Sequence, residues 1–143
     1  MAQRFRGMDD FEATIRILRA DEGGRSSRPR NGIRWDLCYA SDDPQDGIWM
    51  IWPDFLDANG ESRSEAEELP VDSPLPAKML VVSDEIREEA HRHEITVGTR
   101  FYCHEGGRRV AEGVVTRITG LVRKRQTKEE AEPGATDNPD GAQ

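Results

Sequence analysis

Alternation of apolar and polar residues is the dominant pattern along this chain. Residues 11–18 (FEATIRIL) place an apolar side chain at every second position, and residues 33–40 (IRWDLCYA) do the same. That period is typical of strands with one buried face. Further strands are predicted by short apolar runs at 48–52, 78–82, 100–104 and 113–118. About six short strands with little helix between them indicate an all-β fold, an antiparallel barrel or sandwich, and closure would remove exposed sheet edges.

The segments between these runs have the composition of turns and loops. Residues 54–76 combine Gly, Pro, Ser and acidic side chains without sustained periodicity, so we expect an inserted acidic loop with one helical turn around 64–69. Ser83 is a plausible N-cap for a short exposed helix over residues 84–92.

The chain is long enough for one domain with a core of moderate size. We place that domain at residues 11–120, after a loose leader (1–10) and before a polar tail without aromatic residues (121–143), which we expect to be disordered. No stretch approaches the roughly 20 apolar residues of a membrane helix. Since the first residues also lack the apolar core of a signal peptide, we expect a soluble, cytoplasmic protein without membrane partners.

The net charge of −8 is unevenly distributed. Residues 54–76 contain seven acidic side chains and one arginine, and residues 84–94 contain five acidic side chains and two arginines. The predicted strands and their remaining connections are close to neutral. The acidic balance therefore does not exclude an anionic partner.

Catalytic and metal-binding patterns are weak. Cys38 and Cys103 lie in predicted strands, far apart and without a CxxC spacing, and we expect two reduced, buried thiols. His104 and two further histidines are scattered, so we assign no metal and no cofactor. Because no nucleophile–base set or pair of carboxylates in apolar surroundings stands out, we predict that the protein is not an enzyme.

The phrase Glu-Gly-Gly-Arg occurs twice, at residues 22–25 and 105–108. Each copy follows a predicted strand, and the second leads directly into another. Paired glycines at such places favour tight turns, because glycine reaches positive φ at little steric cost. The two copies are then either two hairpin turns or two arginine-tipped corners, at Arg25 and Arg108, on one binding surface.

Two other features could take part in binding. Four arginines occur within ten residues without an intervening acid, at Arg25, Arg28, Arg30 and Arg34. They form either a positive binding patch or a solvated loop. Trp49 and Trp52 could stack bases or sugars, or could simply fill the interior of a small barrel.

The segments FEATIRILRADEGGR, GIRWDLCY and VGTRFYCHEGGRRVAEGVVTRI resemble, in the same order, the C-terminal domain of bacterial elongation factor Tu. The resemblance covers about residues 11–53, 77–83 and 95–120. It implies a closed six-stranded antiparallel barrel, in agreement with the number of predicted strands. The chain lacks a phosphate-loop motif and is too short for a GTPase domain, so we expect no bound GTP.

The resemblance also implies a role in translation. The family's tRNA-contacting arginine in the first EGGR corresponds to Arg25, and its glycine contact in the second EGGR corresponds to Gly106. Asp36 stands where the family has a glutamine, which favours a role other than conventional tRNA delivery. The residues that we expect to bind RNA or a partner are Arg25, Arg28, Arg30, Arg34, Gly106 and Arg108.

Two hypotheses follow. In the first, the chain is a non-catalytic module that docks on a translation-related protein, with the acidic insertions as the contact surface. In the second, the arginine-rich EGGR face binds tRNA or another RNA through its backbone.

Overall fold

The computed structural model describes residues 5, 7–40, 49–88 and 95–122. Within these residues, six strands carry the fold, together with one very short α-helix and two short 3-10 helices. In chain order the elements are β1 (Phe11–Ile17), η1 (Ala20–Glu22), β2 (Trp35–Tyr39), β3 (Trp49–Phe55), β4 (Pro74–Val81), α1 (Asp84–Ile86), β5 (Arg100–Glu105), β6 (Arg108–Ile118) and η4 (Gly120–Val122).

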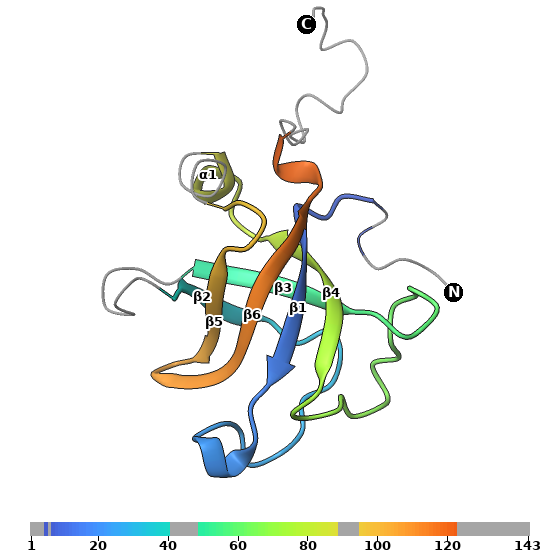
Figure 1. The fold of residues 1–143 in the computed structure, drawn as a ribbon, viewed down its shortest axis with the longest axis vertical. Coiled ribbons are helices and arrows are strands. Elements are labelled where there is room, and N and C mark those ends of the chain that lie inside the picture. The colour runs from blue at the N-terminus through green and yellow to red at the C-terminus, as the bar shows by residue number, and fades with distance from the viewer. Residues whose placement is uncertain (1–4, 6, 41–48, 89–94, 123–143) are drawn as a thin grey trace, which may run out of the picture.

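The six strands form a closed antiparallel barrel in the order β1-β4-β3-β2-β5-β6, and β6 returns to β1. The predicted all-β class and strand number are therefore confirmed, and the barrel is selected over the sandwich. β1 and β6 lie side by side along most of their lengths (Figure 1). No helix among the described residues is long and apolar enough to cross a membrane.

Alternation along the strands fills the barrel interior. In β1 every second residue, from Phe11 to Ile17, is buried. Trp35 from β2 meets Phe55 from β3 edge to face, with ring centroids 6.0 Å apart. Aromatic side chains provide much of the apolar area that a small barrel buries, which explains how a chain with only 35% hydrophobic residues closes one core.

Different segments of the chain lie at the two ends of the barrel (Figure 1). At one end lie the first EGGR segment, which begins at the last residue of η1, and the β5–β6 hairpin, which contains the second. At the other end, α1 and η4 lie beside the start of β1. There Arg87, just after α1, forms a buried ion pair with Asp10 and donates to the carbonyl of Gly120. The Asp10 carboxylate also accepts from the Val81 amide, so the buried charges have several polar partners.

The structure corrects several element boundaries. The acidic segment 54–76 is not a loop throughout, because it contains the end of β3 and the beginning of β4. Leu69, within it, is buried in the core. Around 64–69 the structure has one hydrogen-bonded turn, in which the Glu67 amide donates to the Ser64 carbonyl at 3.5 Å, and no helix. The predicted helix at 84–92 begins as expected, with the Ser83 hydroxyl accepting from the Ile86 amide, while its residues 89–92 lie outside the described part of the chain.

The described residues of the expected leader are attached to the barrel. Phe5 is buried against Trp52, with ring centroids 5.3 Å apart, and Asp9 and Asp10 are buried as well. The first two residues of the expected tail belong to η4, where Leu121 is buried. The rest of the tail, 123–143, lies outside the described residues.

Candidate functional site

The first EGGR segment is not a hairpin turn. β1 pairs with β4 and β6, and not with β2, so the chain leaves β1 through η1 and a long connection. Gly23 ends η1 in the left-handed region, at φ 90°. A Cβ on Gly24 would lie 2.7 Å from the carbonyl oxygen of Leu18 and 2.8 Å from that of Arg19. These two glycines therefore serve a helix end and a close backbone approach.

The second EGGR segment is the predicted hairpin turn. Glu105 at the end of β5 pairs with Arg108 at the start of β6, and Gly106-Gly107 forms the two-residue connection. Gly106 has φ 60°, and a Cβ on either glycine would meet no atom within 4 Å. Positive φ is what a two-residue hairpin requires, and the backbone at its tip is open to solvent.

The two segments meet at one end of the barrel. Arg25 Nη1 lies 3.3 Å from Glu105 Oε2, and Arg108 Nη1 donates to the Gly24 carbonyl at 3.2 Å. Trp35 Nε1 donates to the same Glu105 oxygen at 2.9 Å, which fixes the carboxylate. We name this region the EGGR junction: it is a hollow of about 190 Å³ lined by Arg25, Ser26, Ser27, Glu105 and Arg108.

Cationic side chains continue on one side of the EGGR junction. A second hollow, of about 340 Å³, shares Arg25 and both serines with it and adds Arg28 and Arg19. The side chain of Arg25 is 24% exposed, and its Nη1 atom is buried without a hydrogen bond. Arg28 is exposed. The structure thus brings together Arg25, Arg28 and Arg108, with the Gly106 backbone at the adjacent hairpin tip.

Two of the expected arginines do not join this group. Arg30 Nη1 donates to the carbonyl of Ala66, and the Arg34 guanidinium lies over the ring of Trp52, 4.3 Å from its centroid. Buried Asn31, between them, explains the separation. Its side chain donates to Asp54 Oδ1 at 2.9 Å and accepts from the Phe55 amide at 2.9 Å, which ties this connection to the end of β3.

The two tryptophans, for which base stacking and filling of the barrel were both possible, also lie in different places. Trp49 is buried in the core beside Tyr39, so it fills the barrel. Trp52 lies on the outer side of β3, where the edge of Phe5 and the guanidinium of Arg34 contact its ring. A stacking platform for bases would need an uncovered ring face, so neither position supports one strongly.

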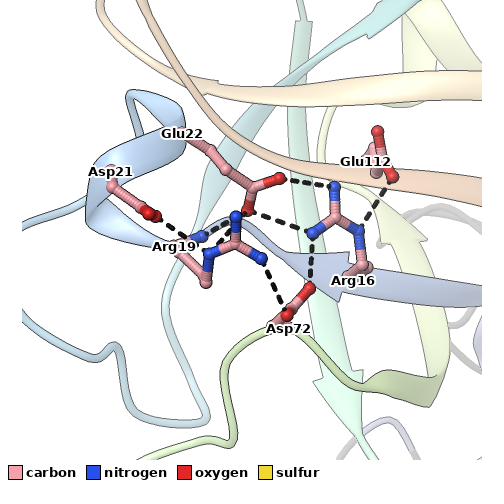
Figure 2. Close-up of polar contacts among 6 residues, drawn as sticks. All are labelled: Arg16, Arg19, Asp21, Glu22, Asp72 and Glu112. Atoms are coloured by element: carbon pink, nitrogen blue, oxygen red, sulfur yellow. Dashed lines mark hydrogen bonds and ion pairs between the residues drawn. The ribbon is translucent and has the colours of Figure 1, made fainter.

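A network of ion pairs holds the first EGGR segment in place (Figure 2). Arg16 on β1 donates to Glu22 at 3.1 and 3.2 Å, to Asp72 at 2.7 Å and to Glu112 on β6 at 2.9 Å. Arg19 adds a bond of 2.9 Å to Asp72. Because one arginine serves three carboxylates from separate parts of the chain, η1 is fixed against both β6 and the segment before β4.

The network also sets the ionisation of its members. Hydrogen bonds from Arg16 and from the Arg19 amide lower the pKa of Glu22, and those from Arg19 and Arg16 lower the pKa of Asp72. The same contacts raise the pKa of Arg16. Sequence reasoning missed this network. Arg16 could have been noticed as an outward-facing charge on an alternating strand, but Asp72, held at φ 63°, lies too far along the chain to be linked with it.

The cysteines are free and buried in strands, as predicted, on β2 and β5. Burial raises the pKa of the Cys103 thiol, which makes it a poor nucleophile. Burial, and then the nearby charge of Arg109, lower the pKa of His104 despite an opposing effect of Asp36. Among the described residues, no group of three or more His, Cys, Asp or Glu side chains is placed to hold a metal ion.

Comparison with known proteins assigns no family to the chain. No protein-family model matches its sequence, and no curated protein matches it. The EGGR junction and the network behind it are therefore the basis for a functional proposal.

Proposed function

We propose that this protein is a non-catalytic binding module related to the C-terminal domain of elongation factor Tu, and that it docks on a protein of the translation machinery through the EGGR junction. The observation that carries the proposal is the mutual contact of the two EGGR segments, in which Arg25 meets Glu105 and Arg108 meets Gly24. Two segments that are far apart in the sequence thereby form one surface.

The EGGR junction is preorganised. Glu105 is held by Trp35 from the barrel, and Glu22 is held by Arg16, so neither segment has to become ordered on binding. A surface that is fixed in advance loses less conformational entropy when a partner docks.

The charges of this surface favour a protein partner. Glu105 lies between Arg25 and Arg108, and exposed Asp21 and Asp72 lie beside the first EGGR segment. An RNA backbone presents only negative phosphates to such a surface, and the carboxylates would repel them. A protein surface can offer both signs of charge in complementary places.

A pull-down from a translation-active bacterial lysate tests the proposal. We expect the tagged full chain to enrich ribosomal proteins or translation factors, and nuclease treatment should leave the enrichment intact. The double substitution Arg25→Ala with Arg108→Ala should reduce capture about tenfold. Arg117→Ala is the matched control, because Arg117 is an exposed arginine near the far end of β6. Equal profiles for both variants and the wild type would overturn the proposal.

One observation favours RNA as a second candidate. The Nη1 atom of Arg25 is buried and forms its ion pair with Glu105 without a hydrogen bond, and the exposed hydroxyls of Ser26 and Ser27 line the same hollow, which could hold one backbone phosphate. Fluorescence anisotropy with labelled tRNA at low salt tests this candidate. Binding should weaken with added salt, and Arg25→Ala with Arg28→Ala should reduce the salt slope by about 1.5 to 2. Undetectable binding at low salt would exclude it.

A further inference from the structure

A third hollow lies on the outer face of the barrel and shares no lining residue with the EGGR junction. Its volume is about 340 Å³, and it extends over β1, β6 and β5 and the turn at Gly98. We name it the β6 groove. An inference about this surface does not rest on the function proposed for the EGGR junction.

The strand register explains the walls of the β6 groove. Thr14 on β1 pairs with Val114 on β6, which pairs with Arg100 on β5. Two residues away, Arg16 pairs with Glu112, which pairs with Tyr102. Cross-strand neighbours on one face of a sheet form rows, so two rows of outward side chains run across the three strands.

The floor of the β6 groove is Gly113, which lies between these rows on the central strand. A Cβ on Gly113 would lie 2.4 Å from Cζ of Phe101, a buried ring in the barrel interior. The β6 backbone can approach this ring only because residue 113 has no side chain. The Glu112 carboxylate is held by Arg16 Nε at 2.9 Å, on the β1 side of the groove (Figure 2). This ion pair holds the Glu112 side chain toward β1 and away from β5.

The β5 side of the groove is cationic and partly aromatic. Arg100 is exposed, and its side chain has no ion pair or hydrogen bond within the described residues. Tyr102 lines the groove, and its ring is contacted by the guanidinium of Arg109, 3.4 Å from the ring centroid, although Arg109 itself does not line the groove. Val114, the cross-strand neighbour of Arg100, and the methyl group of Thr14 supply apolar surface in the groove. This chemistry fits a carboxylate on Arg100 and an apolar group on Val114.

We propose that the β6 groove binds an extended segment of a partner protein in which an acidic side chain lies two residues after an apolar one, because side chains two residues apart in an extended chain share a face. Sites for small molecules usually enclose most of the ligand's surface. The β6 groove instead is open to solvent and runs across three strands, which suits a chain that passes over it. The partner's carboxylate would form charge-assisted hydrogen bonds with Arg100.

Two synthetic peptides test this inference with the full chain labelled with ¹⁵N. Acetyl-Gly-Leu-Gly-Asp-Gly-amide and its Asn counterpart have nearly the same shape and differ in one charge. With the Asp peptide at millimolar concentration, we expect amide shifts at Gly98, Arg100, Gly113 and Val114. The Asn peptide, or the variant Arg100→Gln, should bind about tenfold more weakly. Arg117→Gln, an exposed arginine elsewhere on β6, is the control and should leave binding unchanged.

Several results would overturn the inference. They are no shifts with the Asp peptide, shifts outside the β6 groove, or equal affinity of the two peptides. N-acetyl-leucine tests whether the groove binds a small molecule that has an apolar side chain and a free carboxylate. If it bound as tightly as the Asp peptide, the site would be that of a small molecule and the assignment to a protein segment would be wrong. Val114→Asp provides a second variant, and it should weaken the Asp peptide more than the Asn peptide.

Discussion

The two EGGR segments have the same four residues and different structures. In the second copy the glycines reverse the chain between two paired strands, and nothing lies near them. In the first copy Gly23 ends a 3-10 helix and Gly24 lies against the carbonyl oxygens of Leu18 and Arg19. A repeated motif therefore need not mean a repeated turn, because glycine meets a demand for positive φ in one place and a demand for space in another.

The glutamates differ as well. Glu22 faces away from the EGGR junction into the Arg16 network, whereas Glu105 lies within the junction and contacts Arg25. Glu22 attaches the first copy to Arg16, whereas Glu105 of the second copy contacts Arg25 of the first. Because the two glutamates have different partners, Arg25 and Arg108 lie on one surface. Three predictions test the difference between the two copies.

Matched glycine substitutions should show the largest difference. Gly24→Ala forces a Cβ against two backbone oxygens, which cannot move as a flexible side chain would, and should destabilise the protein by about 1–3 kcal/mol. Gly107→Ala has open space, so we expect a change within about 0.5 kcal/mol. Urea unfolding of both variants measures the difference. Equal losses would show that the glycines have the same role in both copies.

The sequence predicts the barrel better than it predicts the surface. Strand positions could be predicted because one-sided burial requires alternation, as in β1 from Phe11 to Ile17. The meeting of Arg25 with Glu105 could not, since it depends on how β1 and β5 are ordered around the barrel. Four nearby arginines looked like one patch, but Asn31 ties their connection to β3 and separates Arg30 and Arg34 from the rest.

His104, the residue that precedes the second copy, should make the stability of the protein depend on pH. Asp21 has a 75% exposed side chain, whereas His104 is buried and both of its ring nitrogens lack a hydrogen bond. Because the pKa of His104 is lowered in the folded protein, its neutral form is favoured there, and protons bind more readily to the unfolded chain. Its contribution to stability is complete above the ordinary histidine pKa of about 6.5 and decreases as the pH falls below it.

Urea unfolding between pH 8 and pH 5 measures this effect. The wild type should lose stability more steeply than His104→Gln over that range, and the two curves should converge toward low pH. Titration of the His104 ring by NMR provides an independent measurement and should place its pKa below 6.5. A pKa above that value would contradict the prediction, because Asp36 would then outweigh burial and Arg109.

The Arg16 network should give the smallest effect, because its members are partly exposed and solvent screens them. The pKa of Glu22 is lowered below its ordinary value near 4.5, so its contribution to stability is present above that pH and is lost as the pH falls through the folded-state pKa. Glu22→Gln should therefore lose less stability than the wild type between pH 5 and pH 3. Thermal unfolding at both pH values measures the difference, and about 1 M NaCl should diminish it. A difference that persists in high salt would mean that Glu22 supports the first EGGR segment through its hydrogen bonds to Arg16 and the Arg19 amide, whose geometry glutamine can only partly reproduce.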